Sequence, residues 1–303
     1  MEDAEVSLST HENNHGYIYI YICIYIYIYI HIYIYSISIH IYIHIHVLYT
    51  VYYFFFFSGE TILDFVKGYR PKNSDVEHIR ILLHGPVGAG KSSFINSVDS
   101  ILQGHICVRA PYKTYKISNG DGGFYSFVFN DTMGLEKDFD AGVMVEDMKL
   151  LLGGHVEENY KFQSNRSVRE AGYRHNPTLQ DRVHVLVFVV PAEKVKLLSD
   201  EVWKKLREVR LEARQTGIPQ IALITKVDEC PEVGDKIENV HKSKNLKEQL
   251  VHKSLGISPN CIFLVKNYHQ ELQLNNDTNH LILTALKQML HFGEDFLNNL
   301  QTN

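Results

Sequence analysis

The sequence predicts an α/β fold with a mostly parallel sheet and helices on both of its faces. Three observations support this prediction. After about residue 59, short apolar segments typical of strands alternate with longer segments typical of helices. A glycine-rich segment, residues 85–92, lies between one such strand and one such helix. Two short acidic motifs directly follow later strands, where parallel sheets place their binding groups.

The predicted strands are short and mostly apolar. The run VHVLVFVV at residues 183–190 is almost continuously apolar, as expected of a strand that is buried on both faces. Two earlier strands flank Asn119-Gly120, a pair that favours a hairpin because both residues tolerate positive φ. In chain order, the predicted strands are 79–83, 112–117, 124–129, 183–190, 221–225 and 262–265.

Helices are predicted between these strands. Ser199 is suited to cap one of them, which runs to about Gln215 and is followed by Gly217. The polar, irregular stretch 153–181 is predicted to be a surface insertion instead. The predicted helices are 91–102, 141–152, 199–215, 235–255 and 278–298.

The chain divides into a repetitive segment, residues 1–58, and a domain formed by residues 59–303. Within the repeat, Ile alternates with Tyr or His from Tyr17 to His46, and the phase of the alternation slips after Ile34. A slip of one residue would move every side chain to the opposite face, so one regular strand is not expected. Because an AT dinucleotide repeat encodes Ile and Tyr in turn, we interpret this segment as a translated microsatellite. It would then be disordered or an artefact of the gene model.

A membrane anchor is the alternative interpretation of the repeat. No Asp, Glu, Lys or Arg lies between Glu12 and Glu60, and this uncharged run exceeds the ~20 residues that span a bilayer. Tyr, however, prefers the membrane interface to the bilayer centre. The features of a signal peptide, a basic first region and a small-residue cleavage site, are also missing. We therefore do not expect membrane association.

The composition argues against several other classes of protein. The formal net charge is −5, and no basic stripe suited to nucleic acid is found. The four cysteines lie far apart without zinc-site spacing, so neither a disulfide framework nor a zinc site is expected. A reducing, cytoplasmic location is the expectation that follows.

The glycine-rich segment GPVGAGKS at residues 85–92 matches the phosphate-binding pattern G-x-x-x-x-G-K-[ST]. Glycines let backbone N–H groups face phosphate oxygens, and the N-terminus of the next helix adds a partial positive charge. Lys91 is expected to contact the β- and γ-phosphates, and Ser92 to bind Mg²⁺. A chance glycine-rich turn is the alternative. The predicted phosphate-binding residues are Gly85, Val87, Gly88, Ala89, Gly90, Lys91, Ser92 and Ser93.

A D-x-x-G motif, Asp131-Thr132-Met133-Gly134, follows the third predicted strand. Asp131 is expected to hold Mg²⁺ directly or through water, and the Gly134 N–H to meet the γ-phosphate, although Asp131 alone is also suited to capping a turn. Thr114 is the only Thr between Ser93 and Thr132. It is either a further Mg²⁺ ligand or a plain strand residue. The predicted metal ligands are Ser92, Asp131 and Thr114.

The motif Thr225-Lys226-Val227-Asp228 resembles the guanine-recognition pattern [NT]-K-x-D. The Asp228 carboxylate is able to accept both N–H groups on one edge of guanine, whereas adenine has no such pair, and the stem of Lys226 is suited to cover the base. An ordinary charged loop is the alternative. Lys266 and Asn267 follow the last strand and are expected to support the base. The predicted fold is therefore a P-loop NTPase of the Ras-like GTPase type that binds GTP or GDP.

Hydrolysis is expected to be slow. Ras-like enzymes place a glutamine directly after the D-x-x-G glycine to orient water, and here that position is Leu135. Two hypotheses follow: a guanine-nucleotide switch or slow GTPase, and a GTP-binding interaction module that does not hydrolyse. Asp228 disfavours a third, an ATPase.

The combined motifs resemble the interferon-induced protein 44 and 44-like family over residues 60 to about 296. This resemblance implies a GTPase-like domain in a cytoplasmic protein that is induced during antiviral and immune responses. Such a switch would act on protein partners that the sequence does not identify. Some members carry an N-terminal TLDc-type domain, in whose place this chain has the repeat. The resemblance is carried by IRILLHGPVGAGKSSFINSV at 79–98, QGH at 103–105, DTMGL at 131–135, NPTL at 176–179 and VKNYH at 265–269.

Overall fold

A computed structural model shows two units of the chain, Met1–Phe56 and Phe57–Asn303. In the first unit, residues 24–33 form a helix with exposed Ile and Tyr side chains, where no regular structure was predicted. A helix satisfies its own backbone hydrogen bonds, whereas an isolated strand cannot. Within the described ranges, no helix is both long and apolar enough to cross a membrane. The structure describes residues 24–33, 62–107, 114–131, 145–158, 160, 162, 167–195, 197–229 and 253–301.

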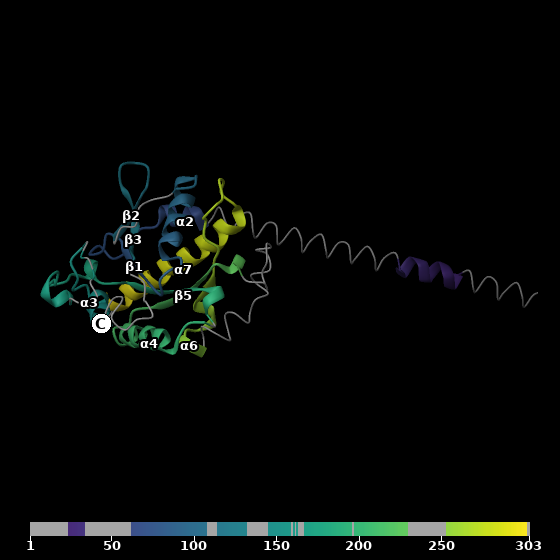
Figure 1. The fold of residues 1–303 in the computed structure, drawn as a ribbon. Helices are drawn as coiled ribbons and strands as arrows, with labels where there is room; N and C mark the ends of the chain where they lie inside the picture. Colours follow the sequence, from purple (N-terminus) through teal and green to yellow (C-terminus); the bar gives the residue numbers. More distant parts are fainter. Residues whose placement is uncertain are drawn as a thin grey trace, which may run out of the picture. The chain divides into compact units, whose positions relative to one another are not determined.

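The second unit is built on a six-stranded sheet with the order β2-β3-β1-β4-β5-β6 (Figure 1). Strand β2 is antiparallel to β3, and the other neighbouring strands are parallel. The predicted mostly parallel sheet is therefore confirmed. The strands are β1 (Ile79–His84), β2 (Thr114–Ser118), β3 (Phe124–Asp131), β4 (Val185–Pro191), β5 (Gln220–Thr225) and β6 (Ile262–Leu264).

Helices cover both faces of this sheet, as predicted (Figure 1). Every residue of β1 is buried, because its side chains alternate between the two cores. Ile81 packs in the core beneath α2 and α7, whereas Leu82 packs in the core beneath α3 and α4. The helices are α2 (Lys91–Gln103), α3 (Val145–Leu152), α4 (Asp200–Gln215), α6 (Lys253–Leu255), α7 (Asn276–Gln301) and a further helix at residues 62–68, with single 3₁₀ turns between elements.

Three helix predictions, 91–102, 199–215 and 278–298, are met closely by α2, α4 and α7, and two are met only in part. Ser199 caps α4 by accepting a hydrogen bond from the Val202 N–H at 3.5 Å, and Gly217 follows the end of this helix with a φ of 74°. The start of the helix predicted from residue 141 lies outside the described residues. So does most of the helix predicted at 235–255, of which α6 is the described end.

The hairpin between β2 and β3 forms by a different mechanism from the one predicted. Positive φ falls on Gly120 (85°) and Gly122 (81°), and not on Asn119. The Asn119 side chain instead accepts hydrogen bonds from the Asp121 N–H at 3.0 Å and the Gly123 N–H at 3.1 Å. Asn119 therefore organises a longer loop through its side chain, which is the second way in which Asn stabilises turns.

A buried histidine joins β1 to the segment that precedes β4. Nδ1 of His184 accepts a hydrogen bond from the Arg80 backbone N–H at 2.9 Å, and Nε2 lies 2.9 Å from the Leu179 carbonyl oxygen. Burial lowers the pKa of His184 to about 4, with Leu179 opposing this shift and the Arg80 charge adding to it. A proton on Nδ1 would also remove the acceptor that Arg80 uses.

We expect the free energy of unfolding to fall as the pH drops from about 7 towards 4. Over this range the unfolded chain, with a histidine pKa of about 6.5, binds a proton that folded His184 excludes. At about pH 5, His184 alone should contribute roughly 2 kcal/mol to the loss. His184→Asn, which keeps an acceptor for Arg80, should flatten the dependence when urea unfolding is measured across this range. An equally steep dependence in the variant would contradict the assignment.

Candidate nucleotide-binding site

The glycine-rich segment 85–92 joins β1 to the N-terminus of α2, as predicted. Gly90, the N-cap residue, has a φ of 88°, and no side chain among the described residues caps this end of the helix. The N–H groups of the first helical turn lack acceptors within the helix, and the helix dipole places partial positive charge there. An uncapped helix N-terminus of this kind favours a bound anion.

Close packing requires glycine at two positions of this loop. A Cβ atom on Gly85 would lie 2.1 Å from the Val189 carbonyl oxygen of β4. A Cβ atom on Gly90 would lie 2.9 Å from Nδ2 of Asn267, at a φ that disfavours other residues. Because they have no side chain, these glycines let the loop pack closely against β4 and against the residues that follow β6.

Lys91 is buried inside this loop. Its Nζ donates hydrogen bonds to the carbonyl oxygens of Gly85 at 3.0 Å and Pro86 at 3.1 Å. Burial lowers the pKa of Lys91, and the nearby Asp131 carboxylate opposes that shift. The loop thus holds a cation close to an uncapped helix end, where an anionic ligand would complete its neutralisation.

Asp131 ends β3 in register with Leu83, so it lies beside the start of the loop. The Ser92 hydroxyl donates a hydrogen bond to Oδ2 of Asp131. Oδ1 is buried and has no hydrogen-bond partner in the described part of the chain. Burial raises the pKa of Asp131, whereas the Ser92 hydrogen bond and Lys91 lower it. An orphaned carboxylate oxygen beside a hydroxyl fits Mg²⁺, which prefers oxygen ligands.

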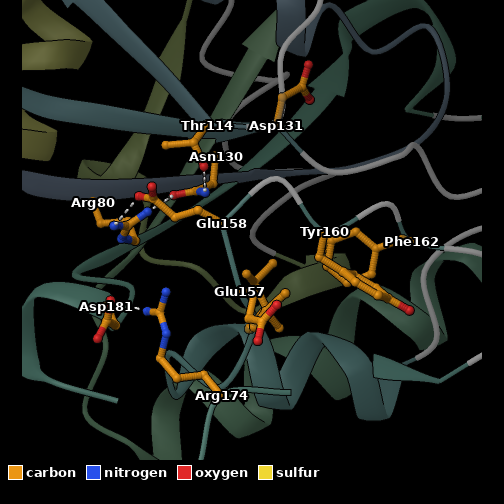
Figure 2. A pocket seen from close by; sticks show the side chains of 12 residues that line it. Arg80, Thr114, Asn130, Asp131, Glu157, Glu158, Tyr160, Phe162, Arg174 and Asp181 are labelled. Atoms are coloured by element: carbon orange, nitrogen blue, oxygen red, sulfur yellow. Dashed lines mark hydrogen bonds and ion pairs between the residues drawn. The ribbon is translucent and has the colours of Figure 1, made fainter. Parts of the chain in front are cut away.

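Of the two remaining predicted residues around the metal and γ-phosphate, the structure describes Thr114 and not Gly134. Thr114 begins β2, and its hydroxyl accepts a hydrogen bond from Nδ2 of Asn130 at 3.1 Å. Figure 2 shows the Asp131 carboxylate pointing away from this pair. Thr114 nevertheless lines one pocket together with Asp131, so its two interpretations, as a Mg²⁺ ligand and as a strand residue, both stay predictions. Gly134 and Leu135 lie outside the described residues.

The pocket that Thr114 and Asp131 line also contains a buried arginine that the sequence analysis missed (Figure 2). Arg80 of β1 is only 5 % exposed and donates hydrogen bonds to Oδ1 of Asn130 at 3.2 Å and the Gln180 carbonyl oxygen at 3.3 Å. Its guanidinium also lies 3.5 Å from Glu158. The signal was a charged residue within an apolar strand. Arg80 joins the insertion to Asn130, the residue that precedes Asp131.

Two residues predicted to bind the nucleotide contact the glycine-rich loop. The buried Thr225 hydroxyl donates a hydrogen bond to the Ala89 carbonyl oxygen at 2.6 Å. Nδ2 of Asn267 donates to the Gly90 carbonyl oxygen at 3.1 Å. The ends of β5 and β6 thereby hold the loop between β1 and α2. These side chains support the site through its backbone.

The remaining guanine-motif residues lie in the loop after β5. Lys226 has a φ of 56° and is the one non-glycine residue with positive φ in the described ranges. Its Nζ lies 3.1 Å from a Glu229 oxygen and 3.5 Å from a Glu193 oxygen. Such strained backbone, costing about 1–3 kcal/mol, occurs preferentially at ligand sites. Asp228 follows, half-buried, in the turn Val227–Glu229.

The segment after β6 contains further residues that the sequence analysis missed. Lys266, predicted to support the base, forms an ion pair with Glu271 at 2.8 Å. Tyr268 donates its backbone N–H to the Ser97 hydroxyl of α2 at 2.9 Å. Tyr268 and Ser97 lie 171 positions apart, so no pattern within one segment predicts their contact. Lys266 and Glu271 are close in sequence, but they belong to no motif that would predict their ion pair.

Structural comparison finds Toc33 from Arabidopsis thaliana, solved in complex with GDP and Mg²⁺. It has 16% identity and a TM-score of 0.44 over 72% of this chain and 85% of that chain. A second Toc33 structure, with Mg²⁺ and GMPPNP, has 18% identity and a TM-score of 0.44 over 78% and 93% of the two chains.

Sequence comparison finds no matching family model, but it does find related proteins. Human interferon-induced protein 44-like is 36% identical over 256 residues, covering 79% of this chain and 57% of that protein. Interferon-induced protein 44 is 34% identical in Pan troglodytes and 32% identical in Mus musculus, each over 80% of this chain and 58% and 61% of the relative. The chain thus spans about three fifths of the length of these relatives. Over four fifths of its own length, it is a homologue of the interferon-induced protein 44 and 44-like family, as its motifs predict.

Proposed function

We propose that this chain binds GTP or GDP together with Mg²⁺ and acts as a nucleotide-dependent switch or slow GTPase in the interferon-induced innate immune response. One observation carries the proposal. The buried Lys91 and the Ser92–Asp131 pair meet at the uncapped N-terminus of α2. This is the carboxyl edge of β1 and β3, where open α/β sheets bind ligands.

Each part of the site has a role in this proposal. Lys91 and the first-turn N–H groups of α2 would hold phosphate oxygens. Ser92 and Asp131 would hold Mg²⁺, which neutralises phosphate charge when bound. Asp228 would select guanine by accepting its two N–H groups. The names of the relatives support the immune context. We include in the same proposal that the protein is cytoplasmic, acts on protein partners and binds neither nucleic acid nor membranes.

The second candidate function is a GTP-binding interaction module without turnover. Leu135 favours it, because an aliphatic side chain at this position cannot orient water by hydrogen bonding. Thr225 and Asn267 favour it as well, since they hold the loop in place without help from a ligand. Such a module would bind the nucleotide chiefly for stability.

Titration of the full chain with fluorescent GTP, GDP and ATP, with and without Mg²⁺, tests the proposal. We expect GTP to bind at least about 100-fold more tightly than ATP, because two hydrogen bonds to a charged acceptor contribute roughly 1.5–3 kcal/mol each. Equal or tighter binding of ATP would contradict the guanine assignment. Phosphate release under single-turnover conditions then separates the two candidates, since the module would bind GTP and release no phosphate.

A further inference from the structure

The loop after β6 is organised by one carboxylate, that of Glu271. It accepts hydrogen bonds from the N–H groups of His269 at 3.0 Å and Gln270 at 3.1 Å. It also pairs with Nζ of Lys266 at 2.8 Å, and the His269 ring lies 3.7 Å away. Burial alone would raise the pKa of Glu271, but these donors lower it to about 2. Glu271 is therefore charged near neutral pH, and its carboxylate holds the loop through these hydrogen bonds and the ion pair with Lys266.

Tyr268 anchors the middle of the same loop to two helices. Its backbone N–H donates to the Ser97 hydroxyl of α2 at 2.9 Å. Its phenol oxygen lies 2.8 Å from Oδ1 of Asn279 in α7 and accepts a hydrogen bond from the Asn275 N–H at 2.7 Å. The backbone and the phenol group of Tyr268 are thus both hydrogen-bonded, which ties this part of the loop to α2 and α7.

Asn267, which directly precedes Tyr268, contacts the glycine-rich loop. Its Nδ2 donates to the Gly90 carbonyl oxygen, and its Oδ1 is buried without a hydrogen-bond partner in the described ranges. Anchoring by Tyr268 fixes this contact independently of Glu271. The contribution specific to Glu271 is the position of Lys266 and of the backbone of residues 269–270.

We propose that Glu271 is a positioning residue for nucleotide binding: its carboxylate pre-forms the base-side loop and fixes Lys266, which slows release of the guanine nucleotide. This inference depends on the guanine-nucleotide binding proposed above. A loop that is ordered before binding does not have to be ordered by the ligand, so the bound state loses less conformational entropy. The effect should act on the base side of the site and leave the phosphate side unchanged.

The test compares GDP release with pyrophosphate binding in the full chain. For Glu271→Gln, we expect fluorescent GDP to dissociate about 10-fold faster, because preorganisation acts mainly through the dissociation rate. Inorganic pyrophosphate, which has no base, should compete with unchanged affinity. Glu271→Asp, which keeps the charge, should restore part of the slow release. Glu146→Gln serves as the matched control, because it removes a carboxylate that pairs with Lys149 at 3.0 Å elsewhere on the surface.

A second variant keeps the test decisive if Glu271→Gln does not fold. Lys266→Met should also speed GDP release, and the double variant should be no faster than the faster single variant, since the two residues act as a pair. Wild-type release rates in both variants, or equal losses of GDP and pyrophosphate affinity, would overturn the positioning role alone. Failure of the wild-type chain to bind GDP would overturn the proposed function and this inference together.

Discussion

Replacing Lys91 by methionine is expected to weaken GTP binding by about 100-fold or more. Methionine keeps the apolar stem in its buried position but removes the ammonium group that now bonds to Gly85 and Pro86. Charge-assisted hydrogen bonds to phosphate contribute roughly 1.5–3 kcal/mol each, and more than one would be lost. Titration calorimetry on the full chain measures the change.

Urea unfolding of Lys91→Met shows whether a loss of GTP affinity comes from the missing ammonium group or from misfolding. Removal of the ammonium leaves the Gly85 and Pro86 carbonyl oxygens without this donor and Asp131 without its nearby cation, so Lys91→Met should unfold at a lower urea concentration than the wild type. Its GTP affinity is therefore measured without urea, where circular dichroism shows that the variant is folded. Lys204→Met, on the exposed face of α4, provides the matched loss of a positive charge. GTP affinity that stays within about twofold of the wild type in Lys91→Met would show that the loop does not hold phosphate through this residue.

Replacing Asp228 by asparagine should change the base that the site prefers. The carboxylate is suited to accept two N–H groups from guanine, whereas an amide accepts one hydrogen bond and donates one. Xanthine carries a carbonyl where guanine carries its amino group, so it matches the amide. We expect GTP affinity to fall by about 100-fold and xanthosine triphosphate to become the tighter ligand.

Competition between the two nucleotides for the variant gives the measurement. Asp200→Asn, at the exposed start of α4, is the matched control and should keep the preference for GTP. A variant that still prefers GTP would show that Asp228 does not contact the base. Lys226→Met would not give as clear a result, because Lys226 already pairs with Glu193 and Glu229.

The sheet was predictable because its signals are local. The apolar runs that form β1, β4 and β5 are buried on both faces, and β1 and β5 are each followed by a loop that carries a motif. Parallel pairing then brings Asp131 beside the start of the glycine-rich loop, so the spacing of the motifs along the chain was enough to predict this juxtaposition.

The supporting contacts were not predictable from local signals. Asn267 and Gly90 lie 177 positions apart, and Thr225 and Ala89 lie 136 positions apart, so no pattern in one segment reveals either pair. A motif predicts which residue type is needed at a position, but it does not predict whether that side chain contacts the ligand or the glycine-rich loop. The helix at residues 24–33 was not predicted for a different reason. Its alternating sequence favours a strand only when a neighbouring strand accepts its backbone hydrogen bonds.

The structure of the full chain bound to GDP and Mg²⁺ tests the guanine-nucleotide site most directly. We predict that the β-phosphate lies within loop 85–92 beside Lys91, that Ser92 and Asp131 face the metal ion, and that the N–H edge of guanine meets Asp228. A nucleotide bound elsewhere, or a base whose N–H edge faces away from Asp228, would contradict the proposed function.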